Sequence, residues 1–280
     1  MLAGVVGAGG PDGAGRWLGA LRSAGRLVLP VECAGCGRWD VALCPRCRDL
    51  LAATPRRCGQ DAPMLAGDGP PVWSVGAYAG AVRSVVLAWK NHRRRDISAA
   101  LLGAVAGAAR AWALDPALRA ALGPAVGASR TVLVMPAPSG LRRRLAHRFV
   151  VGELADAVAR GLASGLADHP AGVDRVLVVD ALRRRGGGAH QAGRGARSRA
   201  RNRRGGVVVA APLPAGAAVV VVDDVVTTGA TLAACVSALS DAGAHVVAGL
   251  ALAGTPAPAR PLRVPGGSVR ADMPAATKCD

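Results

Sequence analysis

The hydrophobic positions of the chain form short apolar runs, separated by segments in which apolar residues recur with helical spacing. The apolar runs have the length of strands and lie at Val72–Tyr78, Thr131–Met135, Asp174–Val179, Val207–Ala210, Val219–Val222 and His245–Leu252. The helical segments lie at Gly80–Trp89, Ile97–Ala113, Pro116–Leu122, Glu153–Leu162 and Leu232–Leu239. Because strands alternate with helices along most of the chain, we predict an α/β fold with a mainly parallel sheet.

The stretch Val219–Leu232 carries the strongest chemical signal. Its four consecutive valines are too short to cross a membrane and too apolar for a surface, so they predict a central parallel strand covered on both faces. Asp223 and Asp224 follow at the expected end of the strand, and Thr227–Thr231 lead into a helix. Ligands of open parallel sheets bind beyond the carboxyl ends of strands, and N–H groups at a helix start attract anions. We therefore predict a phosphate site; the alternative is an ordinary strand, turn and helix, which leaves two buried carboxylates without a ligand.

Cysteines near the amino terminus form two CxxC pairs. Cys33-Ala-Gly-Cys36 and Cys44-Pro-Arg-Cys47 are separated by seven residues. Two tight turns that face each other supply four thiolates to a tetrahedral ion, so we predict a structural zinc site with no open position for substrate. Four unrelated buried cysteines, or a redox pair, are the alternatives.

Three cysteines lie outside these pairs. Cys58 is interpreted as a free thiol or a remnant of a second zinc knuckle, Cys235 as core packing, and Cys279 as part of a loose terminus.

The charge of the chain is strongly basic. Its 280 residues carry a formal net charge of +17 and a pI of about 11.4, which suggests a polyanionic partner. Only Lys90 and Lys278 are lysine, and the excess of Arg, Ala and Gly is equally explained by a GC-rich coding sequence. One Phe, one Tyr and five Trp leave few stacking platforms for single-stranded nucleic acid.

No stretch of eighteen apolar residues is uninterrupted by charge, so we expect no membrane span. The first residues lack a basic segment followed by a sustained apolar one, so a secretory signal is not expected. We predict a cytoplasmic protein, in which paired cysteines bind metal more often than they form disulfides.

Several basic positions are candidates for anion contacts. Lys90 ends a predicted helix, and Arg142–Arg144 follow the Pro136-Ala-Pro138 turn at a strand end, where guanidinium groups hold pyrophosphate bidentately. A solvated basic face is the alternative for both. The Arg/Gly-rich segment between Leu182 and Val207 cannot be core, so we interpret it as a polycationic lid or as a nucleic-acid-binding arm.

The apolar run, the two aspartates and the following Thr-Thr-Gly-Ala-Thr resemble the phosphoribosyl pyrophosphate (PRPP) motif of type I phosphoribosyltransferases. The resemblance implies that Asp223 and Asp224 bind the ribose hydroxyls of PRPP, which binds with Mg²⁺. It assigns the 5-phosphate to Thr227, Thr228, Gly229, Ala230 and Thr231.

The order of the cysteine pairs, the Pro-x-Pro strand end, the basic segment and the PRPP motif resembles the ComF family over residues 27–254. The resemblance implies a type I phosphoribosyltransferase-like, doubly wound, mainly parallel sheet with a small amino-terminal zinc-ribbon-type module. Gln191, Arg199 and Asn202 match the family's loop pattern and are expected to contact the ligand. Arg144 is a candidate pyrophosphate contact, although Leu145 follows it where the family usually has Gly.

These features divide the chain into five predicted parts. They are a loose segment 1–26, a zinc-binding module 27–59, a linker 60–71, a phosphoribosyltransferase-like domain 72–254 and a Pro-rich, disordered tail 255–280.

Two functions remain open. One is an enzyme that transfers a phosphoribosyl group and releases pyrophosphate, and the other is a non-catalytic PRPP-binding scaffold that assists DNA uptake through single-stranded DNA or uptake proteins. The acceptor is not indicated by any side chain.

Overall fold

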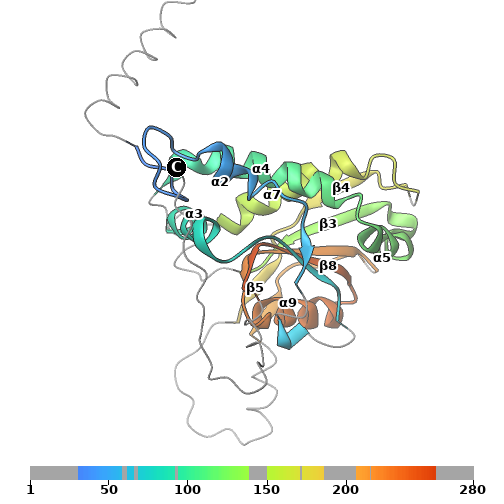
Figure 1. Cartoon of the computed structure of the whole chain (residues 1–280). Coiled ribbons are helices and arrows are strands. Elements are labelled where there is room, and N and C mark those ends of the chain that lie inside the picture. Colours follow the sequence, from blue (N-terminus) through green and yellow to red (C-terminus); the bar gives the residue numbers. More distant parts are fainter. Residues whose placement is uncertain are drawn as a thin grey trace, which may run out of the picture.

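The computed structural model describes residues 31–58, 62–65, 69–91, 94–138, 150–170, 172–185, 206–214 and 216–256. Within them a six-stranded sheet carries helices on both faces (Figure 1). In spatial order its strands are β1 (Arg56–Arg57), β2 (Val72–Ala77), β8 (His245–Gly254), β7 (Ala218–Val226), β3 (Thr131–Pro136) and β4 (Arg175–Val178). Every neighbouring pair is parallel except β1 with β2. The predicted α/β fold with a mainly parallel sheet is confirmed.

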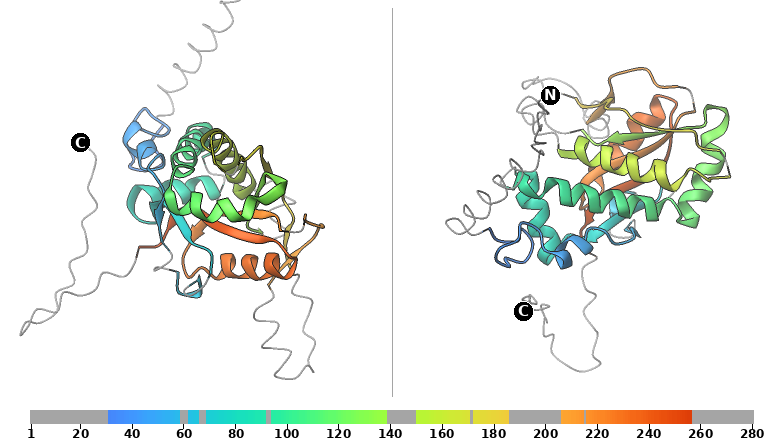
Figure 2. Two further views of the ribbon diagram at one scale, coloured as in Figure 1. Left: turned by 90° about the vertical axis from the view of Figure 1, so that its right-hand side faces the viewer. Right: turned by 90° about the horizontal axis from the view of Figure 1, so that it is seen from above.

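Helices cover the two faces of the sheet unequally. One face carries α3 (Gly80–Lys90), α4 (Ser98–Trp112), α5 (Pro116–Val126) and α7 (Val150–Gly165), and the other carries α9 (Ala230–Asp241). Figure 2 shows α4 and α7 side by side over the sheet, with α9 beneath it. The close packing of α4 and α7 depends on Gly161 and Gly165, because a Cβ at either position would collide with the backbone of α4.

Short helical turns complete the described elements. They are α2 (Pro45–Asp49), η2 (Pro63–Leu65), η3 (Arg95–Ile97) and η4 (Gly127–Ser129). The turn η2 packs against α9 and lies in the segment that the sequence predicts to be a linker. Ala62 and Leu65 are buried in the hydrophobic cluster on the α9 face of the sheet, so part of this segment contributes to the core of the large domain.

The cysteine pairs also share the core of the large domain. Cys33, Cys44 and Cys47 lie in one hydrophobic cluster with residues of α3 and α4. In addition, β1 pairs with β2 along the edge of the main sheet. The amino-terminal part therefore packs directly on the α/β domain.

The central strand β7 is longer than its apolar run. We expected the strand to end at Val222, but the ladder with β8 continues through Asp223↔Ala251 to Val226↔Gly254. The physical reason is that backbone pairing with β8 does not depend on side-chain polarity. Both aspartates consequently lie inside the strand rather than after it.

The Arg/Gly-rich segment joins two paired strands. β5 (Leu182–Arg184) and β6 (Val207–Val209) form a separate antiparallel sheet, and the Arg185 N–H donates to the Gly206 carbonyl at 3.0 Å. The two ends of the segment are thereby held together. Its middle, residues 186–205, lies outside the described residues, as do 1–30, 139–149 and 257–280.

Within the described ranges, no single helix is long and apolar enough to cross a membrane. The segments Arg95–Trp112 and Pro116–Val126 are long and apolar enough only when taken together, and they are bent by 77° at their break. Leu101, Val105, Trp112 and Leu118 of these segments are buried in the core.

Candidate functional site

The carboxyl end of β3 lies beside the part of β7 that directly precedes its two aspartates. Pro136 is the register partner of Val222, and the Ala137 N–H donates to the Val222 carbonyl at 2.7 Å. The Pro136–Pro138 turn therefore adjoins Asp223 and Asp224. This is the edge of a parallel sheet where ligands bind.

The loop between β7 and α9 has the form of an anion seat. Thr227 and Thr228 are exposed, and Gly229 precedes the helix with a left-handed φ of 79°. The Thr228 Oγ1 accepts weakly from the Ala230 N–H at 3.4 Å. The exposed threonine hydroxyls and the helix start leave donors available for a phosphate group.

The segment that carries η2 supports this loop from below. The Met64 N–H donates to the Thr228 carbonyl at 3.1 Å. A Cβ at Gly229 would lie 2.8 Å from Leu65 Cδ1 and 3.0 Å from Ala62 Cβ. Gly229 is therefore required both by its backbone angle and by the side chains packed against it.

Lys90, at the end of α3, points into the site. Its Nζ lies 2.5 Å from Asp224 Oδ2, and the Asp224 side chain is only 8 % exposed. The structure thus places Lys90 at the predicted site, where it compensates the charge of a carboxylate.

Asp223 lies in a different electrostatic environment. Burial and the neighbouring charge of Asp224 raise the pKa of Asp223 to about 7, and the Lys90 ammonium and the Asp224 N–H only partly oppose this shift. The Asp224 N–H donates to Asp223 Oδ1 at 2.8 Å. On the α9 side, burial and the charge of Asp223 raise the pKa of Cys235 to about 12. Cys235 is fully buried, as expected of a core residue.

Arg184 belongs to the site and is missed by sequence reasoning. Its Nε donates to the Pro138 carbonyl at 3.2 Å, which ties β5 to the turn after β3. Its charge also opposes that of Asp223 at Cys235. In the sequence Arg184 is one of many arginines in the Arg/Gly-rich segment, and only the pairing of β5 with β6 separates it from the others.

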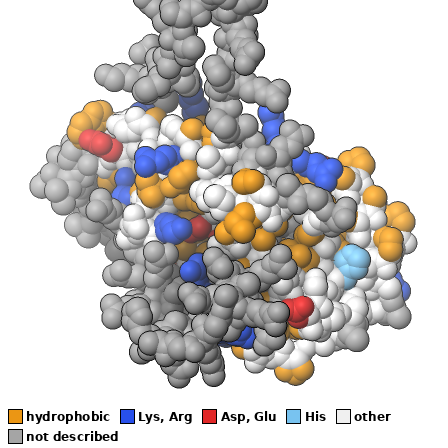
Figure 3. All heavy atoms as spheres, turned by 90° about the horizontal axis from the view of Figure 1, so that it is seen from below, with side chains coloured by type: hydrophobic (Ala, Val, Ile, Leu, Met, Phe, Trp, Pro, Cys, Tyr) orange, Lys and Arg blue, Asp and Glu red, His pale blue; other side chains and the backbone are white. Residues whose placement is uncertain are grey.

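Basic side chains are spread over the face seen from below the sheet. Figure 3 shows several Lys and Arg groups there among hydrophobic and uncharged ones, with few acidic groups. This agrees with the basic composition and favours an anionic ligand. The predicted contacts Arg144, Gln191, Arg199 and Asn202 lie outside the described residues and stay predictions.

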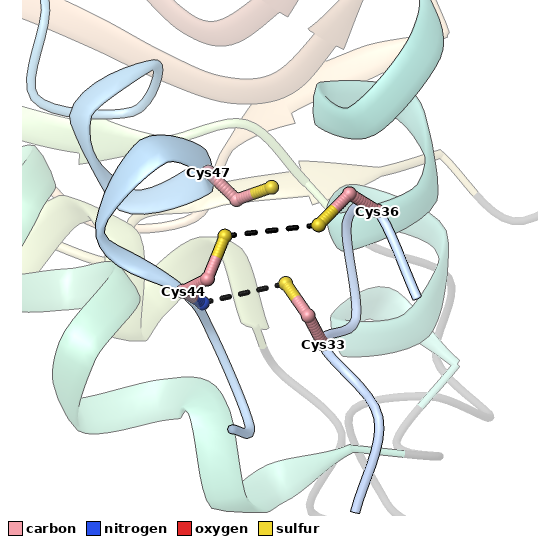
Figure 4. A group of neighbouring side chains, drawn as sticks. All are labelled: Cys33, Cys36, Cys44 and Cys47. Carbon is pink, nitrogen blue, oxygen red and sulfur yellow. Dashed lines mark hydrogen bonds between the residues drawn. The ribbon is translucent and has the colours of Figure 1, made fainter. Parts of the chain in front are cut away.

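Four cysteines converge at a second site. The Sγ atoms of Cys33, Cys36, Cys44 and Cys47 all lie within 4.8 Å of one another (Figure 4). The Sγ atoms of Cys36 and Cys44 are 3.7 Å apart. Four Zn–S bonds of about 2.3 Å in a tetrahedron require S–S distances of about 3.8 Å. The donor set and its spacing therefore fit a zinc ion, as the sequence predicts.

The backbone prepares these thiols for a cation. The Cys44 N–H donates to Cys33 Sγ at 3.3 Å. Burial raises the pKa of Cys33, but bonds from backbone N–H groups of Cys44, Cys36 and Gly35 outweigh it and lower the pKa to about 6. Burial and the neighbouring thiols raise the pKa of Cys47. A divalent cation held by the four sulfur atoms would offset the cost of burying several thiolates together.

Comparison with protein families identifies the type of domain that contains this sheet edge. Residues 153–264 match the phosphoribosyl transferase domain family. The α/β domain that contains these residues is therefore phosphoribosyltransferase-like. The match contains β7, the threonine loop and α9, and β2 and β3 lie outside it but pair with β8 and β7. A comparison with curated proteins gave no match.

Proposed function

We propose that this chain is a ComF-type phosphoribosyltransferase that binds PRPP with Mg²⁺ and transfers its phosphoribosyl group with release of pyrophosphate. The observation that carries the proposal is the arrangement at the end of β7. There, two buried adjacent carboxylates, one of them paired with Lys90, lie beside an exposed threonine loop that opens α9. Buried carboxylates of this kind are costly unless a ligand or partner uses them.

Each part of the site has a role in binding PRPP. Thr227, Thr228 and the N–H groups at the start of α9 hold the 5-phosphate. The ribose hydroxyls donate to Asp223 and Asp224, and Lys90 positions Asp224 through its contact at Oδ2. Arg184, at the base of the Arg/Gly-rich segment, adds positive charge for the pyrophosphate. Mg²⁺ bound with PRPP supplies further charge neutralisation on the leaving group.

Transfer requires the acceptor to form a bond to C1 of the ribose while the bond to the pyrophosphate oxygen breaks. Positive charge develops on the ring during this step, and negative charge leaves with pyrophosphate. The site residues contribute by orienting the ribose and by balancing these charges. Basic residues near the leaving group and carboxylates near the ribose have the polarity that this separation of charge needs.

Binding and turnover are tested by two separate measurements. Calorimetric titration with PRPP and Mg²⁺ gives the affinity, and pyrophosphate release is followed with a panel of bases and with ammonia as acceptors. Asp224→Asn should weaken PRPP binding at least about tenfold, since a hydrogen bond to a charged group is worth about 1.5–3 kcal/mol. Asp241→Asn is the matched control, because Asp241 is exposed at the far end of α9. Unchanged affinity in the Asp224 variant would rule out this site.

A non-catalytic scaffold that assists DNA uptake is the second candidate. It is favoured by the net charge of +17 and by the arginine-rich segment that joins β5 to β6. PRPP binding without pyrophosphate release from any acceptor would favour this function over the enzyme. Binding of single-stranded DNA should then weaken steeply with salt, because phosphate contacts release counterions. A flat salt dependence would exclude it.

A further inference from the structure

Helix α3 contacts both the four-cysteine site and the sheet edge. In the middle of α3, Val85 packs against Gly35, which lies between Cys33 and Cys36. A Cβ added at Gly35 would lie 3.2 Å from Val85 Cγ2 and 2.7 Å from Cys47 Sγ. In its last turn, Lys90 pairs with Asp224. Five residues of helix span about 7.5 Å, so a shift of α3 at the cysteine site is carried directly to Lys90.

Arg94 ties the residues after α3 to the backbone of the cysteine site. Its Nη1 donates to the Glu32 carbonyl at 2.6 Å, and its Nη2 donates to the Ala42 carbonyl at 3.2 Å. Glu32 directly precedes Cys33, and Ala42 lies two residues before Cys44. A single guanidinium therefore holds the chain ahead of both CxxC pairs.

The guanidinium of Arg94 is held in one orientation. Asp96 accepts from Arg94 Nε at 2.9 Å and from Nη2 at 2.8 Å, which fixes the plane of the guanidinium. The Ala42 carbonyl also accepts from the Ala34 N–H at 3.0 Å, so the two knuckles meet at the atom that Arg94 binds. The Arg94 side chain is 24 % exposed.

We infer that Arg94 is a positioning residue that couples the four-cysteine site to the PRPP site. When the cysteine site is filled, Arg94 and Val85 hold α3 so that Lys90 contacts Asp224 in the geometry that PRPP requires. When the metal is removed, the two CxxC pairs are no longer held by one ion. Arg94 and Val85 then no longer fix the position of α3, and Lys90 moves away from Asp224. The inference rests on the proposed function for its ligand, but the movement of Lys90 is measurable without PRPP.

The first test uses amine labelling. Lys90 and Lys278 are the only lysines, so reductive methylation followed by mass spectrometry reports on Lys90 with Lys278 as the internal reference. Removal of zinc with a chelator, or the Arg94→Ala substitution, should raise the labelling rate of Lys90 relative to Lys278 about fivefold or more. Arg94→Lys should give an intermediate rate, because an ammonium keeps the charge but lacks the planar fork that reaches both carbonyls.

Arg95→Ala is the matched control. It removes the same charge from the neighbouring residue, whose side chain is 62 % exposed and lies 3.6 Å from Glu153. This variant should label like wild type and keep its zinc. Circular dichroism and thermal melting confirm that each variant is folded before its labelling rate is compared.

The second test measures PRPP affinity by titration. Arg94→Ala should raise the Kd for PRPP about fivefold or more, and zinc removal should raise that of the wild type by a similar factor. The Lys90→Met variant lacks the contact with Asp224, so zinc removal should leave its Kd for PRPP unchanged. A Lys90 labelling rate that changes neither on zinc removal nor in Arg94→Ala would overturn the coupling. If labelling responds but no variant or wild type binds PRPP, the proposed function fails while the coupling of Arg94 to Lys90 stands.

Discussion

Lys90 Nζ and Asp224 Oδ2 lie 2.5 Å apart, and this contact joins the end of α3 to the central strand of the sheet. Lys90 compensates the charge of Asp224, and Asp223 lies buried beside this pair. Their combined charge sets how the site responds to substitution, to pH and to its ligand.

Replacement of Lys90 by Met should destabilise the protein by about 1–3 kcal/mol. The substitution keeps much of the apolar stem but leaves Asp224 buried without a cationic partner. Urea denaturation gives the free energy of unfolding. Arg95→Met, which alters an exposed cation on the same part of the chain, should change this free energy by less than about 0.5 kcal/mol. Equal stability of the Lys90 variant and wild type would show that the pair contributes nothing.

Stability should fall as pH rises from about 4 to about 7. The pKa of Asp223 is raised from an ordinary value of 3.8 to about 7 by burial and by Asp224. The folded state therefore binds this proton more tightly than the unfolded state, so the stabilisation is full below pH 4 and is lost as pH passes 7. Urea denaturation at a series of pH values measures the slope. Asp223→Asn should reduce the fall in the free energy of unfolding between about pH 4 and pH 7. Asp241→Asn, at an exposed position, should leave this fall unchanged.

Zinc should be lost when a knuckle cysteine is replaced. Cys33→Ser and Cys44→Ser each remove one of four ligands that lie within 4.8 Å of one another, and an incomplete set binds zinc far more weakly. Metal analysis after dialysis measures the content. Cys235→Ala, which alters a buried cysteine on the α9 face, should keep the full zinc content. Retention of zinc in both knuckle variants would exclude the site.

Gly229→Ala should cost more stability than Gly243→Ala. Both glycines have a left-handed φ, 79° and 75°, so both substitutions carry a backbone strain of about 1–2 kcal/mol. Only at Gly229 would the added Cβ also meet Leu65 and Ala62, whereas nothing lies within 4 Å at Gly243. Thermal melting compares the two variants. PRPP titration should show weaker binding for Gly229→Ala alone, because the threonine loop must move.

The parts of the site that sequence reasoning predicts are local in the chain. The threonine loop and the two CxxC pairs are recognisable because each places its functional atoms within a few consecutive residues. The four thiols converge in the structure, and the residues that match the phosphoribosyl transferase domain family include the threonine loop. Hydrophobic periodicity likewise locates β2, β3, β7 and β8, because burial of their apolar residues determines where they lie.

The remaining contacts join residues that are far apart in the chain. Arg94 reaches the Glu32 carbonyl across 62 positions and Arg184 reaches the Pro138 carbonyl across 46. No local pattern distinguishes either arginine from its neighbours in Arg93-Arg94-Arg95 or Arg183-Arg184-Arg185. The apolar run predicts too early an end for β7 for a related reason, because the last residues of this strand are held by backbone pairing with β8.

The absence of space at Gly229 has a consequence for how the protein can be divided. Leu65 and Ala62 form one wall of the threonine loop, and Met64 bonds to its backbone. A chain that began at Val72 would keep the carboxylates and the threonines but lose that wall. The smallest unit able to bind PRPP should therefore include residues 62–65, which precede the first long strand.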